Sequence, residues 1–427
     1  MLGGRLVAVC AAAAWCASGA SSASAADGCS KRIARSNLVS CVLAASVSLQ
    51  REQLGVEVMR AREQAASPLL PSNPQLALSA AQRHIAQQNA GNWNASLSQE
   101  LEIAGQRSAR TDAARAGLNA QRQSLRASER EVAAEAWRAY FEALAARDAQ
   151  LTAAKLEQAF TRGGQAAAAG AAQGLVSGID AELAELTLVR LTQARIAAQA
   201  RERQAHAQLA TLLGLDPRGS QLQIEGELTP LASALTDTPQ ALNAAVERRP
   251  ELSRARETGR AHSADATALR RSRVPNVTLS IFAQRDGFSE RVLGGGIALP
   301  IPLPSPIGRT FAGEIAASEA LAQQAEAAAK GVRRQARLEL VTALQGYDAA
   351  QAQSALYTTA RVAEAERSLT SLAQEIHAGR ISVSSAVIAQ QTLIEFLRAH
   401  IEAQLELCLA SVELVRASGL DMNGARP

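Results

Sequence analysis

The sequence predicts a mainly α-helical protein with a small β part and an internal two-fold repeat. Aromatic residues are only 3% of the 427 residues while apolar residues are 47%, which favours closely packed helices over a thick mixed core. A glycine turn, a long helical pattern and a closing Gly-Leu-Asp occur twice, at 174–216 and 379–421. Their opening glycines lie 205 residues apart, as do their closing glycines, so we interpret the chain as two tandem copies of one unit.

Residues 1–26 are typical of a secretory signal peptide. Arg5 supplies a positive start, residues 6–17 form an apolar run, and small residues at 23–26 offer a cleavage site. An N-terminal membrane anchor is the alternative, but the run is short for a span of about 20 apolar residues. No later segment is an apolar run of that length, so we expect an exported protein without a transmembrane helix.

Three cysteines, Cys29, Cys41 and Cys408, follow the signal peptide. Export permits a disulfide, and Cys29–Cys41 is the candidate pair, with unpaired cysteines as the alternative. Lipid attachment at Cys41, which ends the sequence Leu-Val-Ser-Cys, is disfavoured because no apolar run precedes it.

The first copy begins with a helical pattern at 36–65, where apolar residues recur at three-to-four spacing. Prolines between 68 and 74 prevent its continuation. A strand-like segment follows at 75–84, and a loop rich in asparagine and glycine is expected at 89–92.

The clearest strand occupies 93–103. Its odd positions, beginning with Trp93, are apolar except for Gln99, and its even positions are polar, which is the period of a strand with two different faces. Its length matches the roughly 9–11 residues with which a tilted strand crosses a bilayer. A half-buried strand of a soluble sheet is the alternative, but the expected export and the small number of strands weigh against it.

A very long helical pattern runs from about residue 105 to 173, with a glycine-marked interruption at 162–170. About 65 residues at a rise of about 1.5 Å each make a helix of about 100 Å. Such a helix needs coiled-coil partners and does not fit inside a globule. The chain reverses at 174–178, Asp180 is placed to cap the returning helix, and Gly214 ends that helix.

The second copy repeats this order. A helical pattern at 240–271 breaks near Pro250, and a β-hairpin is expected at 275–303. A second very long helix is expected at 308–378, and the last helix follows the turn at Gly379.

Two features mark the second β-hairpin. Three consecutive glycines at 294–296 are interpreted as a strand irregularity. Alternate residues near its end are prolines, which lack an N–H for the ladder and must lie at an edge or at the exit from the sheet. These prolines are Pro300, Pro302, Pro304 and Pro306.

The chain therefore divides into a signal peptide, two repeats joined by a linker, and a tail. Each repeat contains a helix, a β-hairpin (75–103 or 275–303) and a long helical hairpin. The expected boundaries are 1–26 for the signal peptide, 27–216 for the first repeat, 217–239 for the linker, 240–421 for the second repeat and 422–427 for the tail.

The four expected strands cannot close a barrel alone, because about eight strands are the practical minimum. An open sheet edge cannot lie in lipid. If these strands span a membrane, several chains must pool them, and three copies supply twelve.

Two pairs of short motifs carry a family resemblance. Both hairpins start with Pro-x-apolar-x-Leu-Ser, at Pro74 and Pro275, and the turns begin Gly174-Leu-Val-Ser and Gly379-Arg-Ile-Ser. In this order and duplication the chain resembles the TolC-type outer-membrane efflux proteins, or outer membrane factors, over almost its whole mature length. That family also tends to carry a helix-borne tyrosine upstream of each turn, and Tyr140 and Tyr347 match these positions.

The resemblance implies a homotrimer in the outer membrane of a Gram-negative-type cell. Its twelve-stranded β-barrel would lie among outer-membrane lipid, and its long α-helical coiled-coil barrel would cross the periplasm. Such a trimer is the passive exit duct of a tripartite efflux system. A periplasmic adaptor protein and an inner-membrane transporter, here expected to be of the RND type, complete the assembly, and the transporter supplies the energy.

Residues 97–110 narrow the resemblance. Leu-Ser-Gln at 97–99, followed by glutamates, a glycine and basic residues, resembles the strand-to-helix segment of the heavy-metal (CzcC-like) branch, which implies heavy-metal cations as cargo. The exit duct of a drug-efflux or type I secretion system is an alternative. A periplasmic coiled-coil adaptor without a barrel is another, but adaptors usually have one helical hairpin and compact β domains.

By the same resemblance, the two helical tips face the adaptor and close the resting duct. Known family members carry acidic residues after both turns. Asp180 matches the first acidic position, whereas the second positions are Ser385 and Ile388, so we expect no acidic ring from the second tip. The expected docking residues are Gly174, Leu175, Val176, Ser177, Gly379, Arg380, Ile381 and Ser382, and the expected aperture residues are Asp180, Ser385 and Ile388.

Other chemistry finds no support in the sequence. The five histidines have neither an i, i+4 pair nor a nearby cysteine cluster of the kind that binds zinc. No glycine-rich phosphate loop follows a strand, and no nucleophile motif is present. The net charge of +4 comes from interspersed acids and bases, unlike a nucleic-acid-binding patch. We therefore expect no enzyme activity, no cofactor and no nucleic acid.

Overall fold

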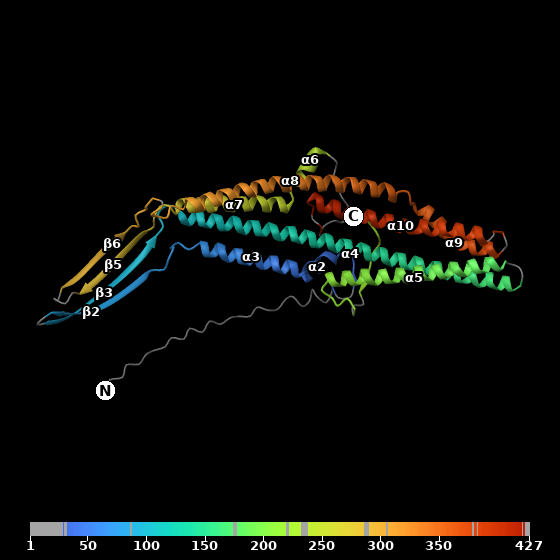
Figure 1. Ribbon diagram of the computed structural model, residues 1–427, viewed down its shortest axis with the longest axis horizontal. Coiled ribbons are helices and arrows are strands. Elements are labelled where there is room, and N and C mark those ends of the chain that lie inside the picture. The colour runs from blue at the N-terminus through green and yellow to red at the C-terminus, as the bar shows by residue number, and fades with distance from the viewer. Residues whose placement is uncertain are drawn as a thin grey trace, which may run out of the picture.

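The computed structural model describes residues 29, 32–85, 88–173, 177–218, 222–231, 238–285, 290–304, 306–377, 380–381, 383–420 and 422. The molecule is elongated, with strands at one end and long helices running from them to the other end (Figure 1). The mainly helical fold with a small β part and two similar halves is confirmed. The expected signal peptide, residues 1–26, lies outside the described residues.

The first repeat contains α2 (Leu38–Ala45), α3 (Val47–Ala66), β2 (Gln75–Ile85), β3 (Gln88–Leu101), α4 (Gln106–Ala172) and α5 (Gly178–Leu212). We predicted one helix over 36–65, but Ser46 between α2 and α3 is extended, with φ −71° and ψ 114°. Its Oγ accepts a hydrogen bond from the N–H of Leu49 at 3.4 Å, so Ser46 ends one helix and caps the next.

Three other predictions for the first repeat are wrong. Residues 89–92 are strand, because they pair with 81–84 of β2 and the ladder satisfies their backbone. α4 is continuous through 162–170, where a run of alanines favours helix over a glycine break. Ser177, not Asp180, caps α5, since its Oγ accepts the N–H two residues further on at 3.3 Å.

The second repeat contains α6 (Pro239–Glu247), α7 (Pro250–Arg271), β5 (Val277–Arg285), β6 (Arg291–Ala298), α8 (Ala312–Ser354), α9 (Thr359–His377) and α10 (Val383–Ser418). The break near Pro250 is confirmed. The single helix expected over 308–378 is wrong: it begins at Ala312 and is interrupted at 355–358. There the ring of Tyr357 packs on the ring of Phe396 in α10, and the two ring centroids are 5.2 Å apart.

The four long strands form one antiparallel sheet in the order β2-β3-β5-β6. β6 ends at Ala298 rather than continuing to 303, so the alternating prolines lie at the exit from the sheet, as predicted. The glycines at 294–296 pair regularly with β5, which contradicts the expected irregularity. A Cβ on Gly294 would lie 2.4 Å from the ring of Phe282, so this glycine makes room for a cross-strand aromatic side chain.

A second, smaller sheet lies in the middle of the molecule. β1 (Arg32–Ile33) pairs in parallel with β4 (Gln223–Ile224) of the linker. A disulfide joins Cys29, just before β1, to Cys41 in α2, with Cα atoms 5.6 Å apart. The candidate disulfide is confirmed, and Cys41 therefore has no free thiol to carry a lipid.

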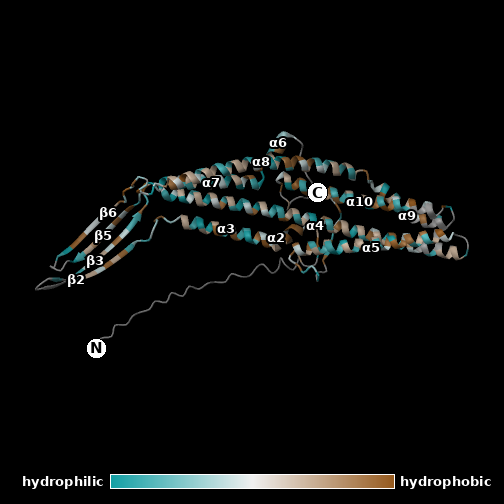
Figure 2. Ribbon diagram, viewed as in Figure 1, coloured by the Kyte–Doolittle hydropathy of each residue, from teal (hydrophilic) through white to brown (hydrophobic). Residues whose placement is uncertain are grey.

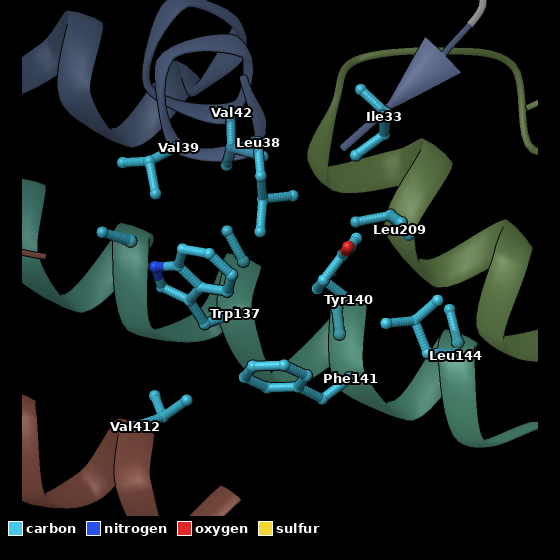
Figure 3. Close-up of a cluster of buried hydrophobic side chains, with 14 of the residues drawn as sticks. Ile33, Leu38, Val39, Val42, Trp137, Tyr140, Phe141, Leu144, Leu209 and Val412 are labelled. Carbon is cyan, nitrogen blue, oxygen red and sulfur yellow. The ribbon is translucent and has the colours of Figure 1, made fainter. Parts of the chain in front are cut away.

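The largest hydrophobic core surrounds this small sheet and joins α2, α4, α5 and α10. Trp137, Tyr140 and Phe141 of α4 are buried in it (Figure 3). The hydroxyl of Tyr140 donates a hydrogen bond to the carbonyl of Glu225 at 2.6 Å. Tyr140, one of the two tyrosines of the family resemblance, therefore fixes the linker to the helices.

Charged side chains tie the two repeats together beside this core. Arg138 of α4 contacts Glu413 of α10 at 2.7 Å, and Arg416 of α10 contacts Glu131 of α4 at 3.7 Å. Arg416 also contacts Glu413 within α10, at 2.9 Å. Burial acts to raise the pKa of Glu413, but the hydrogen bonds from Arg138 and Arg416 outweigh it and hold this pKa below its ordinary value.

We expect Gly226→Ala to destabilise the protein by roughly 1–3 kcal/mol, because an L side chain rarely adopts a φ far above zero. Gly226 has φ +133°, and an added Cβ would lie 2.3 Å from the Tyr140 hydroxyl oxygen. Gly331→Ala in α8 is the control, since its Cβ would have no atom within 4 Å. The control should stabilise the helix by up to about 1 kcal/mol. Circular dichroism during thermal denaturation in detergent measures both, and equal midpoints would contradict the prediction.

We also expect a pH-dependent contribution from Glu413. Because its pKa is lower in the folded protein, its stabilising effect is complete above the ordinary carboxyl pKa and is lost as the pH falls through the folded value. Glu413→Gln should cost roughly 1–2 kcal/mol at pH 7, and the difference from the wild type should shrink below about pH 4. Glu326→Gln, at an exposed pair with Lys330, is the control and should leave the denaturation midpoint unchanged. A deficit of Glu413→Gln that stays constant down to low pH would refute this.

Candidate functional site: the sheet and the helix tips

One side of the four-stranded sheet is a continuous, exposed apolar surface, which we call the apolar face. Cross-strand partners point to the same side, so the strand register defines its rows. Taken toward the helices, the rows that cross β3, β5 and β6 are Ala80, Trp93, Arg285 and Arg291; then Leu78, Ala95, Ala283 and Leu293; then Leu76, Leu97, Ile281 and Gly295; then Gln99, Leu279 and Ile297. On the far side of the first of these rows, β2 and β3 continue with the pairs Gln82–Gly91 and His84–Asn89.

The apolar side chains of this face are unusually accessible. Leu78 is 72% exposed, Ile281 63% and Leu293 84%. Figure 2 shows apolar residues alternating with polar ones along the strands. A continuous exposed apolar surface of this kind indicates contact with lipid or with another protein.

The opposite side of the sheet, the polar face, carries hydroxyl and amide side chains. The Asn94 side-chain amide donates to the Gln284 side chain at 3.5 Å, and the Ser280 hydroxyl donates to the Gly296 carbonyl at 3.2 Å. A sheet with one apolar and one polar face is suited to separate lipid from water. The members of the polar face include Ser79, Asn94, Ser96, Ser98, Glu100, Thr278, Ser280, Phe282 and Gln284.

Each of the two outer strands of the sheet, β2 and β6, leaves one edge unpaired. Among the described residues, β2 pairs only with β3, and β6 pairs only with β5. The unpaired N–H and C=O groups of an exposed edge are ready to bond to another strand, so this sheet is structurally incomplete.

A polar junction connects the sheet to α4. Glu100 accepts hydrogen bonds from the side chains of Asn276 (2.8 Å) and Ser72 (3.3 Å). Gln106, the first residue of α4, donates to Asn276 at 3.1 Å, and Arg110 is bonded to Glu102. The segment 97–110, singled out by the heavy-metal resemblance, therefore has structural partners on both hairpins.

The helix tips lie at the other end of the molecule, where the structure describes only some of the predicted residues. Of the docking residues, Gly174, Leu175, Val176, Gly379 and Ser382 lie outside the described residues. Ser177 is exposed and caps α5. Arg380 binds back to Glu375 of α9 through its guanidinium (3.2 Å) and its N–H (3.1 Å), so it closes the end of α9.

The predicted aperture residues follow the two predicted turns in the sequence. Asp180 lies in the first turn of α5, and Ser385 and Ile388 lie in the first turns of α10. Ser385 is exposed, and Ile388 is 68% exposed. The second tip therefore presents an apolar and a hydroxyl side chain where an acidic ring would need carboxylates.

A groove of about 650 Å³ separates the two helical hairpins and is lined by α4, α5 and α10. Its floor includes Leu156, Leu191 and Ile394, which form a small core. Gln390 is a buried polar residue in the same wall, 2% exposed. This groove was not predicted from the sequence, although Gln390 and Gln391 interrupt the apolar pattern of the last helix and could have signalled it.

The two repeats differ in the long helices that lead to their tips. α4 is unbroken over 67 residues, whereas its counterpart consists of α8, with 43 residues, and α9, with 19. At the break, Thr358 caps α9 by accepting the N–H of Arg361 at 3.3 Å. Burial lowers the pKa of the nearby His400, against the opposing effect of Glu366, so the ring that packs on Tyr357 is neutral at pH 7.

Burial shifts the pKa values of two other potentially reactive side chains, Cys408 and His206. Burial raises the pKa of the Cys408 thiol to about 12, so this cysteine is not a thiolate nucleophile at neutral pH. Burial also lowers the pKa of His206. Within the described part of the chain, no group of three or more His, Cys, Asp or Glu side chains is placed to hold a metal ion.

None of the helices that the structure describes is both long and apolar enough to cross a membrane.

Comparisons with known proteins agree with this architecture. Residues 38–215 and 241–420 match the family model for outer membrane efflux proteins. Protein CyaE of Bordetella pertussis is 30% identical over 266 residues, which are 59% of this chain and 56% of that protein. The chain therefore spans just over half the length of this curated relative.

Solved structures share the fold. CusC, whose structure is described in terms of transmembrane channel formation, has a TM-score of 0.73 at 18% identity, over 91% of this chain and 92% of CusC. The outer membrane protein VceC from Vibrio cholerae also has a TM-score of 0.73, at 20% identity, over 91% of this chain and 96% of VceC. At these identities the likeness establishes the fold.

Proposed function

Because the chain belongs to the outer membrane efflux protein family, we propose that it is the outer-membrane exit duct of a tripartite export system and conducts its cargo passively. The observation that carries this proposal is the four-stranded sheet, with an exposed apolar face, a polar face and two open edges. Lipid would cover the apolar face, and water in the duct would wet the polar face.

The open edges support a trimer. Lipid cannot satisfy the backbone groups of a sheet edge, and four strands are too few to close on themselves. In a homotrimer, β6 of each copy would pair with β2 of the next, which closes a barrel of twelve strands. The strands have 8 to 14 residues, near the roughly 9–11 that a tilted strand needs to cross a bilayer.

The helices support a long conduit beyond the membrane. At about 1.5 Å per residue, α4 alone is about 100 Å long. Three copies would surround a coiled-coil tunnel that crosses the periplasm of a Gram-negative-type cell. A periplasmic adaptor would dock at the tips, and an inner-membrane transporter would supply the energy. The family resemblance favours a transporter of the RND type.

The tips would gate this conduit. Ser177, Arg380 and Ile381 are the described residues that we propose to face the adaptor, together with Gly174, Leu175, Val176, Gly379 and Ser382. Asp180, Ser385 and Ile388 would line the aperture. The α8–α9 break gives the second hairpin a joint that α4 lacks, so the second tip is the one we expect to move when the adaptor binds.

The cargo of the duct is inferred from a single segment of the sequence. The proposal that the cargo is heavy-metal cations rests on segment 97–110 alone. The contacts of Glu100, Gln106 and Arg110 at the sheet–helix junction give that segment a structural role. These contacts are equally compatible with metal cations, drugs and secreted polypeptides as the cargo. The identity of the partner transporter is the observation that would decide among them.

Adjacent residues of β3 test the assignment of the two faces. Leu97→Arg places a charge near the middle of the apolar face and should cost roughly 2–4 kcal/mol in the membrane, which depletes assembled protein from outer-membrane fractions. Ser98→Arg, on the polar face, should assemble normally and change single-channel conductance. If both variants assembled equally well, the apolar face would not contact lipid.

The aperture generates a second prediction. Without carboxylates at Ser385 and Ile388, block of single-channel current by divalent cations should be weak, and Asp180→Ala should weaken it further. Ile388→Asp should introduce strong block, because three copies would place an acidic ring in the duct. Strong block in the wild type that survives Asp180→Ala and disappears when the second tip is altered would contradict this account.

A further inference from the structure

The row of the apolar face that is farthest from the helices and crosses all four strands differs from the rows nearer the helices. It contains Ala80, Trp93, Arg285 and Arg291 in register across the four strands. Arg285 and Arg291 are direct cross-strand partners, and both are exposed. Beyond this row β2 and β3 continue on the same side with the pairs Gln82–Gly91 and His84–Asn89, so the two arginines lie where the apolar rows end.

No carboxylate that the structure describes is bonded to this pair. Like charges directly opposite in an antiparallel pair are destabilising, and within the described residues neither arginine has an ion pair or side-chain hydrogen bond. The arginines near the other end of the second hairpin are different. Arg270 pairs with Glu319, Arg273 donates to the carbonyl of Thr310 at 3.0 Å, and Arg309 pairs with Glu314 at 3.1 Å.

The position of the row indicates what supplies the anion. β2 and β5 end at the side of the sheet away from the helices (Figure 1). If the sheet spans the outer membrane as proposed above, this row lies where the outer leaflet's head groups begin. Trp93, 46% exposed and opposite Arg285, is the side chain that membrane barrels place at such an interface.

We propose that Arg285, Arg291 and Trp93 form a binding site for a phosphorylated lipid head group of the outer leaflet. The guanidinium groups would bind phosphate through paired N–H donors. The acyl chains would lie along the next rows, over Leu293 and Ile281, which are 84% and 63% exposed. This continuity with the apolar face favours a lipid over a free anion. The inference rests on the proposed membrane-spanning role of the sheet.

Native mass spectrometry of the full-length protein in detergent, titrated with phosphorylated lipid A, tests the site. R285Q/R291Q should weaken binding by roughly 30-fold, the effect expected from removing two basic side chains at a membrane surface. R334Q/R337Q, which removes two exposed arginines from α8, is the matched control and should bind like the wild type. R285K/R291K keeps both charges and should lose less affinity than R285Q/R291Q.

Two further arms identify the ligand. Dephosphorylated lipid A should bind the wild type about as weakly as phosphorylated lipid A binds R285Q/R291Q, and millimolar inorganic phosphate should not displace the lipid. Equal binding of phosphorylated lipid A by the wild type and R285Q/R291Q overturns the inference, as does displacement by inorganic phosphate. Single-channel conductance is recorded for each preparation. If the wild type conducts and binds phosphorylated lipid A no better than R285Q/R291Q does, this site alone is refuted. If the wild type never conducts in a bilayer, the proposed function is refuted and the site with it.

Discussion

The rest of the structure depends on a sheet that one chain cannot complete. Its apolar face is exposed, and both of its outer strands lack a partner among the described residues. Water is a poor solvent for the face and lipid is a poor solvent for the edges. Only an assembly that places lipid on one side and closes the edges strand to strand satisfies both conditions.

The internal repeat is the means by which one chain supplies a symmetric part of such an assembly. Each half contributes one β-hairpin, and β3 and β5 join them. The halves are then held together far from the sheet by the core around Trp137, Tyr140 and Phe141 and by the ion pairs of Arg138 with Glu413 and of Arg416 with Glu131. Because the junction at Glu100 and Gln106 couples the strands to α4, the positions of the barrel and of the tips depend on one another.

Much of this could be predicted from the sequence where a pattern is long and periodic. The alternation that starts at Trp93 predicted a two-faced strand, and the prolines after Leu299 predicted the exit from the sheet. Features that depend on tertiary contacts could not be predicted. β1 and β4 have two residues each, too few for a period. The α8–α9 break is accompanied by the packing of Tyr357 on Phe396, and the pairing of Arg285 with Arg291 is visible only once the register is known. The docking and aperture residues came from the family resemblance and remain predictions.

The central claim is that the chain forms a membrane duct only as a closed assembly of three copies. The most direct measurement is the number of chains in the particle that detergent extracts from outer membranes, together with the conductance of that same particle in a lipid bilayer. Our account predicts a heat-modifiable particle of three chains that conducts, with no conductance from single chains. A soluble monomer in the periplasmic fraction, or a single chain that conducts by itself, would contradict it.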